Sequence, residues 1–234
     1  MLEPVKPDIM PRPRVLITGF GPFPGAAENS SAWLVEALTG THPSSRPECD
    51  IHAEVLPTEW AEVAKLGPRL VQRHRPRLIL HLGLSKRARE FRIERSAHNL
   101  IDLREDARGV FPGRRTILDR AEGRLYTAIP TSQLAKHLRT QDLPAVASRS
   151  AGTYLCNYLY YLSLHWARRQ DEACDVCFVH LPPGPRQGGP LSEADLLRGA
   201  ELILRYLLAF AMERDRVEDG EIGRVVRHTE PMPP

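Results

Sequence analysis

The chain has 234 residues with 32 basic and 29 acidic side chains, a net charge of +3 that does not indicate a nucleic-acid-binding surface. This length is enough for one large domain whose core needs neither disulfides nor metal. Four irregularly spaced cysteines, with no recognisable signal peptide or long apolar span, predict a protein of the reducing cytoplasm that has no membrane partner.

The first half of the chain predicts alternating strands and helices. Prolines recur through residues 1–13, and because proline lacks a backbone donor we expect an extended or disordered arm there. Apolar strand patterns follow at 15–18, 51–56 and 78–82, with helices capped by Asn29 or Ser30 and opened by Pro57-Thr58. The run at 78–82 is almost wholly apolar, which is typical of a strand covered on both faces. These patterns predict an α/β fold, a three-layer α/β/α sandwich with a mixed, mostly parallel central sheet.

The second half begins with a long irregular segment. Between residues 85 and 125, charged residues and glycines separate short apolar pieces, which predicts a functional insertion. A short helix at 134–138, a helix ending near Arg169, a strand at 176–181 and a helix capped by Ser192 follow. Residues 214–234 lose apolar periodicity, so we predict a single domain over 14–213 and a disordered tail after it.

A lone cysteine lies where a predicted strand, a glycine turn and a helix meet. Cys156 follows Gly152 and begins an apolar pattern at helical spacing. Unpaired N–H groups and the macrodipole at a helix N-terminus stabilise a thiolate, which favours a lowered cysteine pKa. Cys156 is therefore the candidate nucleophile, although a small buried hydrophobe is the commoner role for a free cysteine.

The candidate base is a histidine at the end of a predicted strand. His180 precedes a proline-glycine loop, at the carboxyl edge where α/β sheets bind ligands. Because Cys156 also follows the carboxyl end of its strand, we expect both side chains at the same edge, where they can form a thiolate–imidazolium pair. His81, inside an apolar strand, and His98, near the irregular segment, are the competing histidines.

Two further patterns point to cofactors only weakly. The loop at 19–25 follows a strand, but Pro22 and Pro24 remove N–H donors and the spacing of a dinucleotide-binding loop is absent. Cys174 and Cys177 form one C-x-x-C pair with no second pair, which favours buried thiols over zinc. We therefore expect no metal and no cofactor.

Four separated motifs occur in a defined order: VLITGFGPF at 15–23, HLGL at 81–84 with IER at 93–95, SAGTYLCN at 150–157 and FVHLP at 178–182. Together they resemble the motifs of the pyroglutamyl peptidase I family of cysteine peptidases, also called pyrrolidone carboxyl peptidases. The resemblance extends from about residue 15 to about residue 208. It implies an omega peptidase that removes pyroglutamate from the N-terminus of peptides by thiolate acyl transfer, without metal or cofactor.

The resemblance also implies a role for each site residue. Cys156 would be the nucleophile, His180 the general base and then acid, and Glu94 the acceptor that orients His180. Arg104 would bind the oxyanion together with the backbone N–H of Cys156. The pocket for the pyroglutamyl ring would be lined by Phe20, Phe23, Thr58, Tyr154 and Leu155.

Two loops depart from the family pattern. The family usually has Ile-Pro-Asp-Asn-Glu-Gly after the arginine, whereas residues 105–109 here are Glu-Asp-Ala-Arg-Gly, which makes Arg108 an alternative to Arg104. The segment 85–92, commonly small and glycine-rich in the family, carries four cations: Lys86, Arg87, Arg89 and Arg92. Two alternatives stay open, a divergent relative that hydrolyses another small amide and a noncatalytic binding protein that retains the pocket. Relatives often form dimers or tetramers, so a homo-oligomer is also open.

Overall fold

The computed structural model describes residues 12–40 and 49–227. Within them the strands are β1 (Arg14–Phe20), β2 (Asp50–Leu56), β3 (Leu78–Leu84), β4 (Phe91–Glu94), β5 (Ser96–His98), β6 (Arg124–Tyr126), β7 (Ala145–Ser148) and β8 (Asp175–Leu181). The helices are α1 (Ser30–Gly40), α2 (Trp60–His74), α3 (Thr131–Arg139), α4 (Leu155–Ala167) and α5 (Glu193–Arg227), with a short 3-10 helix at Pro185–Gln187. Apart from Arg12 and Pro13, the predicted arm lies outside the described residues.

The central sheet is mixed. Its strand order is β2-β1-β3-β8-β4-β7, and the first four strands run parallel to one another. Strand β4 is antiparallel to β8, and β7 is parallel to β4. This topology confirms the predicted mixed, mostly parallel sheet.

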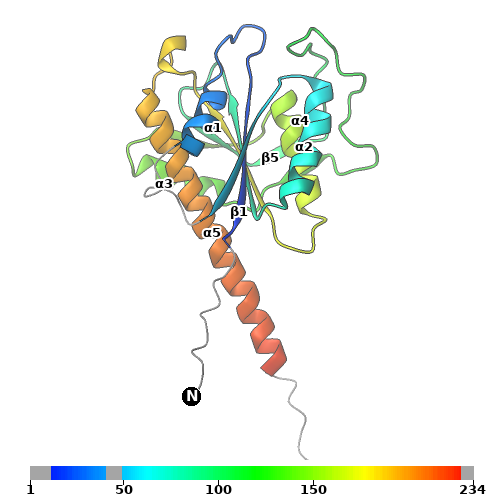
Figure 1. The fold of residues 1–234 in the computed structure, drawn as a ribbon, viewed down its shortest axis with the longest axis vertical. Helices are drawn as coiled ribbons and strands as arrows, with labels where there is room; N and C mark the ends of the chain where they lie inside the picture. Colours follow the sequence, from blue (N-terminus) through cyan, green and yellow to red (C-terminus); the bar gives the residue numbers. More distant parts are fainter. Residues whose placement is uncertain (1–11, 41–48, 228–234) are drawn as a thin grey trace, which may run out of the picture.

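Helices cover both faces of this sheet (Figure 1). One core cluster joins it to α1, α3 and α5, and a second joins it to α2 and α4. Strand β3 is buried along its whole length, with Leu78, Leu80 and Leu82 in the first cluster and Ile79 in the second. Burial on both faces explains its continuous apolar sequence and confirms the three-layer sandwich.

The segment predicted to be irregular, 85–125, contains strands that its sequence pattern did not indicate: β4 joins the central sheet, and β5 pairs with β6 in a separate two-stranded sheet. Side chains hold the part between β5 and β6. The Asn157 side chain, in the first turn of α4, accepts a hydrogen bond from His98 N at 2.7 Å and donates to the carbonyls of His98 and Leu100. Asn99 Oδ1 accepts bonds from the backbone N–H groups of Ile117 and Leu118 at 2.9 and 2.8 Å. These amides fix the insertion against the helix that carries Cys156.

Helix α5 continues beyond the predicted end of the domain. The tail predicted to be disordered from residue 214 is helical as far as Arg227. Apolar periodicity was a poor guide here, because polar contacts hold this part of the helix: Arg77 donates to Asp215 at 2.7 Å, and Arg214 pairs with buried Asp175. Among the described residues, no helix has the length and apolar character needed to cross a membrane.

Candidate active site

A histidine–carboxylate pair occupies the sheet where β8 and β4 meet. His180, near the end of β8, is paired across the sheet with Arg92, and Glu94 ends β4. His180 Nδ1 donates to Glu94 Oε1 at 2.8 Å, and the Glu94 side chain is 1% exposed. Since this bond occupies Nδ1, the imidazole presents Nε2 to the Cys156 sulfur.

Cys156 lies in the first turn of α4, facing β3. A Cβ built on Gly83 would stand only 3.0 Å from Cys156 Sγ, and Gly83 is paired with His180 in the β3–β8 register. The sulfur therefore lies near the imidazole, close enough for its negative charge to act on the His180 ring. Sequence reasoning expected this pair.

The reason given for the pair was nevertheless wrong. We assumed that Cys156 and His180 follow strands that end at the same edge of the sheet, but β7 and β8 point in opposite directions. Ser148, the last residue of β7, pairs with Glu94, and Glu94 pairs with Phe178. The segment between β7 and α4 brings the chain back to His180, and a local apolar pattern contains no information on strand direction.

The surroundings of His180 favour its protonated form. Burial by itself would lower the pKa, but the negative charge of Cys156, the hydrogen bond to that sulfur and the Glu94 carboxylate raise the pKa of His180 to about 9. At neutral pH the imidazole therefore carries a proton. An imidazolium beside the sulfur is the partner that a nucleophilic cysteine needs when it attacks a carbonyl.

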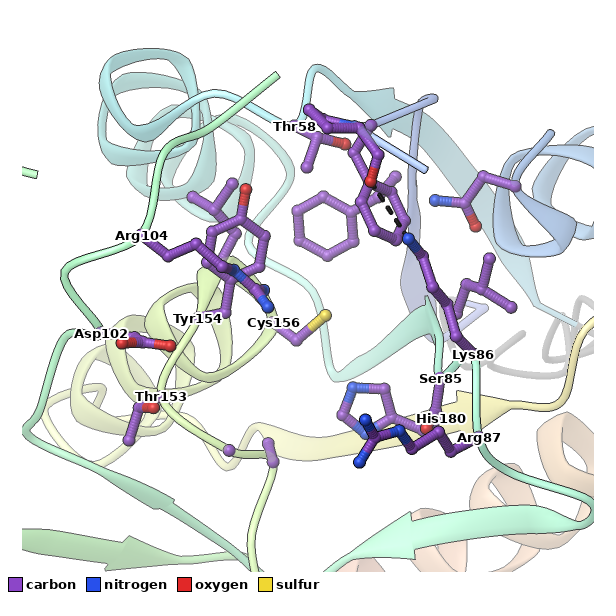
Figure 2. Close-up of a pocket in the computed structure, with 18 of the residues that line it drawn as sticks. Thr58, Ser85, Lys86, Arg87, Asp102, Arg104, Thr153, Tyr154, Cys156 and His180 are labelled. Carbon is purple, nitrogen blue, oxygen red and sulfur yellow. Dashed lines mark hydrogen bonds between the residues drawn. The ribbon is translucent and has the colours of Figure 1, made fainter. Parts of the chain in front are cut away.

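Two kinds of donor surround the sulfur. Tyr154 precedes α4, and its side chain makes no capping hydrogen bond to the backbone N–H groups of the first turn, which leaves these groups as potential donors beside Cys156. Figure 2 shows Arg104 extending over Tyr154 toward Cys156, and its guanidinium lies 3.7 Å from the Tyr154 ring centroid. Trp60 Nε1 donates to the Arg104 carbonyl at 3.1 Å, which fixes the start of this side chain.

One cavity of about 780 Å³ contains Cys156 and His180. All the residues predicted to surround the pyroglutamyl ring line it, as does Arg104: Phe20, Phe23, Thr58, Tyr154 and Leu155. Glu94 lies behind His180 and not on the cavity wall. The structure thus brings every predicted site residue to one place.

The loop between β1 and α1 is fixed by polar side chains. Thr58 Oγ1 and Asn29 Nδ2 both donate to the Gly21 carbonyl at 2.9 Å. Lys86 Nζ donates to the Pro24 carbonyl at 3.1 Å and lies 4.8 Å from the Phe23 ring centroid (Figure 2). Hydrogen bonds therefore hold the backbone behind the aromatic wall, and the Lys86 ammonium places a positive charge over Phe23.

The competing residues lie elsewhere. His81 is 1% exposed, its ring nitrogens are bonded to Thr18 and Ser163, and burial lowers its pKa to about 3. His98 and Arg108 do not line the cavity, and Arg108 pairs with Glu59 at 3.6 Å. In the described residues, no cluster of three or more histidine, cysteine or acidic side chains is placed to hold a metal ion.

Sequence reasoning missed two residues that position the site. Gly83 leaves room for the sulfur, and a glycine inside an apolar strand was an available signal for a close approach. Tyr160, one helical turn after Cys156, donates its hydroxyl to the Glu94 carbonyl at 3.0 Å. Nothing in the apolar pattern of α4 distinguished this tyrosine from an ordinary core residue.

Comparisons with known proteins agree with this geometry. The family model for pyroglutamyl peptidase matches residues 13–192. Human (Homo sapiens) pyroglutamyl-peptidase 1 is 30% identical over 220 residues, covering 93% of this chain and 99% of that protein. A pyrrolidone-carboxylate peptidase of Bacillus cereus is 29% identical over 213 residues, covering 88% and 97%.

Solved structures extend the similarity to three dimensions. Pyrrolidone carboxyl peptidase from Thermococcus litoralis superposes with a TM-score of 0.80 at 27% identity, covering 87% of this chain and 96% of that one. The sequence similarity and the similarity of fold thus point to the same group of proteins. The family expected from the sequence motifs is confirmed, and this chain belongs to the pyroglutamyl peptidase family of cysteine peptidases.

Proposed function

We propose that this protein is a cysteine exopeptidase that removes N-terminal pyroglutamate from peptides in the cytoplasm. The observation that carries the proposal is the Cys156–His180 pair in a cavity lined by Phe20 and Phe23, with the imidazole hydrogen-bonded to Glu94. The cytoplasmic location is supported by four cysteines that are all free thiols. The mechanism follows from the protonation state of the pair.

In the first step the Cys156 thiolate attacks the pyroglutamyl carbonyl carbon. A C–S bond forms while the carbonyl π electrons move to oxygen, and the backbone N–H of Cys156 and the Arg104 guanidinium stabilise the resulting oxyanion. Glu94 holds the His180 ring in place and stabilises its positive charge. No proton has to be removed from the nucleophile first.

In the second step His180 Nε2 transfers its proton to the amide nitrogen as the C–N bond breaks. The shortened peptide leaves as an amine, and pyroglutamate remains on Cys156 as a thioester. Neutral His180 then removes a proton from water, and the hydroxide that forms attacks the thioester carbonyl. When the C–S bond breaks, free pyroglutamate, the thiolate and the imidazolium are restored.

Recognition of the ring rests on the wall opposite the catalytic pair. The lactam is flat and uncharged, which suits the faces of Phe20 and Phe23. Lys86 adds an ammonium with unused donor capacity near this wall. The site therefore combines apolar contact with a charge that favours carbonyl oxygens.

The direct test is hydrolysis of a pyroglutamyl fluorogenic amide by the purified protein and its Cys156→Ser variant. We expect turnover by the native protein and none by the variant, because an alcohol is far less acidic than a thiol. Circular dichroism checks that the variant is folded. An inactive native protein in which Cys156 still reacts with iodoacetamide would contradict the proposed substrate, and an active Cys156→Ser variant would contradict the nucleophile.

A further inference from the structure

Besides the His180 imidazolium, one lysine and two arginine side chains line the catalytic cavity, and they differ in their present partners. Lys86 is bonded to the Pro24 carbonyl and lies over Phe23, and Arg104 lies over Tyr154. Arg87 is exposed and has no hydrogen bond or ion pair with any residue that the structure describes. Its guanidinium is therefore available to a ligand.

The loop that carries Arg87 continues from β3 alongside the strand of His180. Gly83 is paired with His180 and Leu84 with Leu181, and Ser85 N donates to the Leu181 carbonyl at 2.9 Å. Arg87 follows two residues later and lines the cavity on this side. In Figure 2 the Arg87 and His180 side chains lie together, across the cavity from Asp102 and Thr153.

The chemistry of the reaction fixes the direction of the substrate. In the proposed reaction the ring lies against Phe20 and its carbonyl carbon meets Cys156, so the leaving nitrogen must face the proton of His180. The residue bonded to that nitrogen, the first after pyroglutamate, therefore leaves the cavity past His180. The next charged side chain on that path is Arg87.

We propose that Arg87 binds a carboxylate on the residue that follows pyroglutamate, so that the protein prefers acidic substrates. The inference rests on the proposed function. The carboxylate comes from an aspartate or glutamate side chain or from the free C-terminus of a pyroglutamyl dipeptide. A planar guanidinium can pair with either group through two parallel N–H donors.

The two walls of the cavity differ in the sign of the charges that line them. The acidic groups that line it, Asp102 and Glu105, come from the insertion with Arg104, whereas Lys86 and Arg87 come from the loop after β3. A carboxylate passing His180 therefore meets a cation on the near wall and acids on the far wall. This arrangement favours a negative charge at one position of the peptide.

The expected effect is moderate because Arg87 is exposed to solvent. An ion pair at such a site corresponds to a preference of about three- to tenfold in kcat/KM, and it weakens as salt is added. A salt-dependent preference distinguishes an ion pair from a simple fit of shape.

Matched peptides test the inference. The kcat/KM for pyroglutamyl-glutamate amide is compared with that for the isosteric pyroglutamyl-glutamine amide, which isolates a side-chain carboxylate. Pyroglutamyl-glutamine as the free acid is then compared with its amide, which isolates a C-terminal carboxylate. We expect a preference for the acid in at least one comparison, with pyroglutamyl-lysine amide the poorest substrate. Released amine is measured by chromatography at low and high ionic strength.

Two variants with the same charge change separate Arg87 from general electrostatics. Arg87→Gln should abolish the preference, measured as the ratio of kcat/KM for the acidic peptide to kcat/KM for the neutral peptide in the same variant. Arg89→Gln, an exposed cation of the same loop that does not line the cavity, should retain the preference. Arg87→Glu should reverse it in favour of the lysine peptide.

The outcomes distinguish this inference from the proposed function. If all the peptides are cleaved at equal rates, or if Arg87→Gln keeps the full preference, the role of Arg87 is overturned and the peptidase remains. If none is cleaved, the proposed function fails and the inference fails with it.

Discussion

Gly83 and Cys156 are in contact across the interface between β3 and α4. A Cβ on Gly83 would stand 3.0 Å from Cys156 Sγ and 2.9 Å from the Phe178 ring. Both approaches are too close for an additional carbon, and the rigid strand pairing with β8 leaves little room for relief. The absence of a side chain at Gly83 therefore sets the position of the nucleophile.

Gly83→Ala should impair catalysis more than stability. We expect kcat/KM on a pyroglutamyl amide to fall about 100-fold, because small displacements of a reacting atom are costly. Overpacking should lower the unfolding free energy by about 1–3 kcal/mol. Gly113→Ala is the control, since its added carbon would meet nothing within 4 Å. Full activity in Gly83→Ala would show that the sulfur tolerates a shift.

Alkylation at neutral pH should label a single thiol. Burial raises the pKa of Cys49 to about 11 and that of Cys174 to about 12, and it raises the pKa of Cys177 further. Only the Cys156 sulfur lies beside an imidazolium in an open cavity. Mass spectrometry after iodoacetamide treatment should find one modified residue, and Cys156→Ser should take up no label. Labelling of Cys174 at a comparable rate would contradict this picture.

The pH profile should fall on the alkaline side near the raised pKa of His180. Since that pKa is raised from 6.5 to about 9, the imidazolium persists through neutral pH and is lost as the pH rises through about 9. The leaving amine then lacks its proton donor, so kcat/KM declines. Glu94→Gln removes a charge that raises this pKa, and its alkaline limb should lie at lower pH. If the alkaline limb of Glu94→Gln lies at the same pH as that of the native protein, a group other than His180 causes the decline.

The cluster of ion pairs formed by Arg77, Asp175, Arg214 and Asp215 lies where β3 and β8 begin, away from the catalytic cavity. It should matter for stability and not for catalysis. The Asp175 side chain is fully buried and accepts from Arg77 at 2.7 Å, while the Asp215 side chain is 45% exposed. Asp175→Asn leaves cations without their buried partner and should cost about 3 kcal/mol of unfolding free energy. Asp215→Asn should cost less than about 1 kcal/mol. Denaturant titration compares the two, and equal effects would contradict the assigned burial.

Selectivity for the lactam should depend on charge as well as shape. Prolyl and glutaminyl amides carry an ammonium where pyroglutamate is neutral, and Lys86 lies 4.8 Å from the centroid of Phe23. Repulsion and desolvation together should favour the pyroglutamyl amide by at least about 100-fold in kcat/KM. Lys86→Met should reduce this ratio of kcat/KM values, because the repulsive charge is removed. Comparable rates for the prolyl and pyroglutamyl compounds would contradict the pocket as described.

The local features of the fold were accessible from sequence because each depends on near neighbours in the chain. The apolar run of β3 indicated two-sided burial, and the spacing after Cys156 placed it in the first turn of a helix. The direction of β7 depends on its pairing with β4, which no local pattern contains. The helical continuation past residue 213 likewise depends on Asp175, a residue distant in sequence.

The site likewise has a part that the sequence predicted and a part that it did not. The resemblance to the family motifs predicted that Cys156, His180 and Glu94 act together. The stacking of Arg104 on Tyr154 and the bond from Tyr160 to Glu94 arise from tertiary packing. Such contacts follow from the relative placement of elements and could not be predicted from spacing.

The position of β8 has a consequence for how the protein is made. This strand alone connects β2-β1-β3 to β4-β7, yet it is the last strand of the sheet to be synthesised. During synthesis on the ribosome, the strands on both sides of β8 emerge before residues 175–181 do, and they cannot form one sheet until β8 is present. The same strand contains His180. A nascent or truncated chain therefore has no assembled peptidase site, and proteolytic activity begins only when the sheet closes.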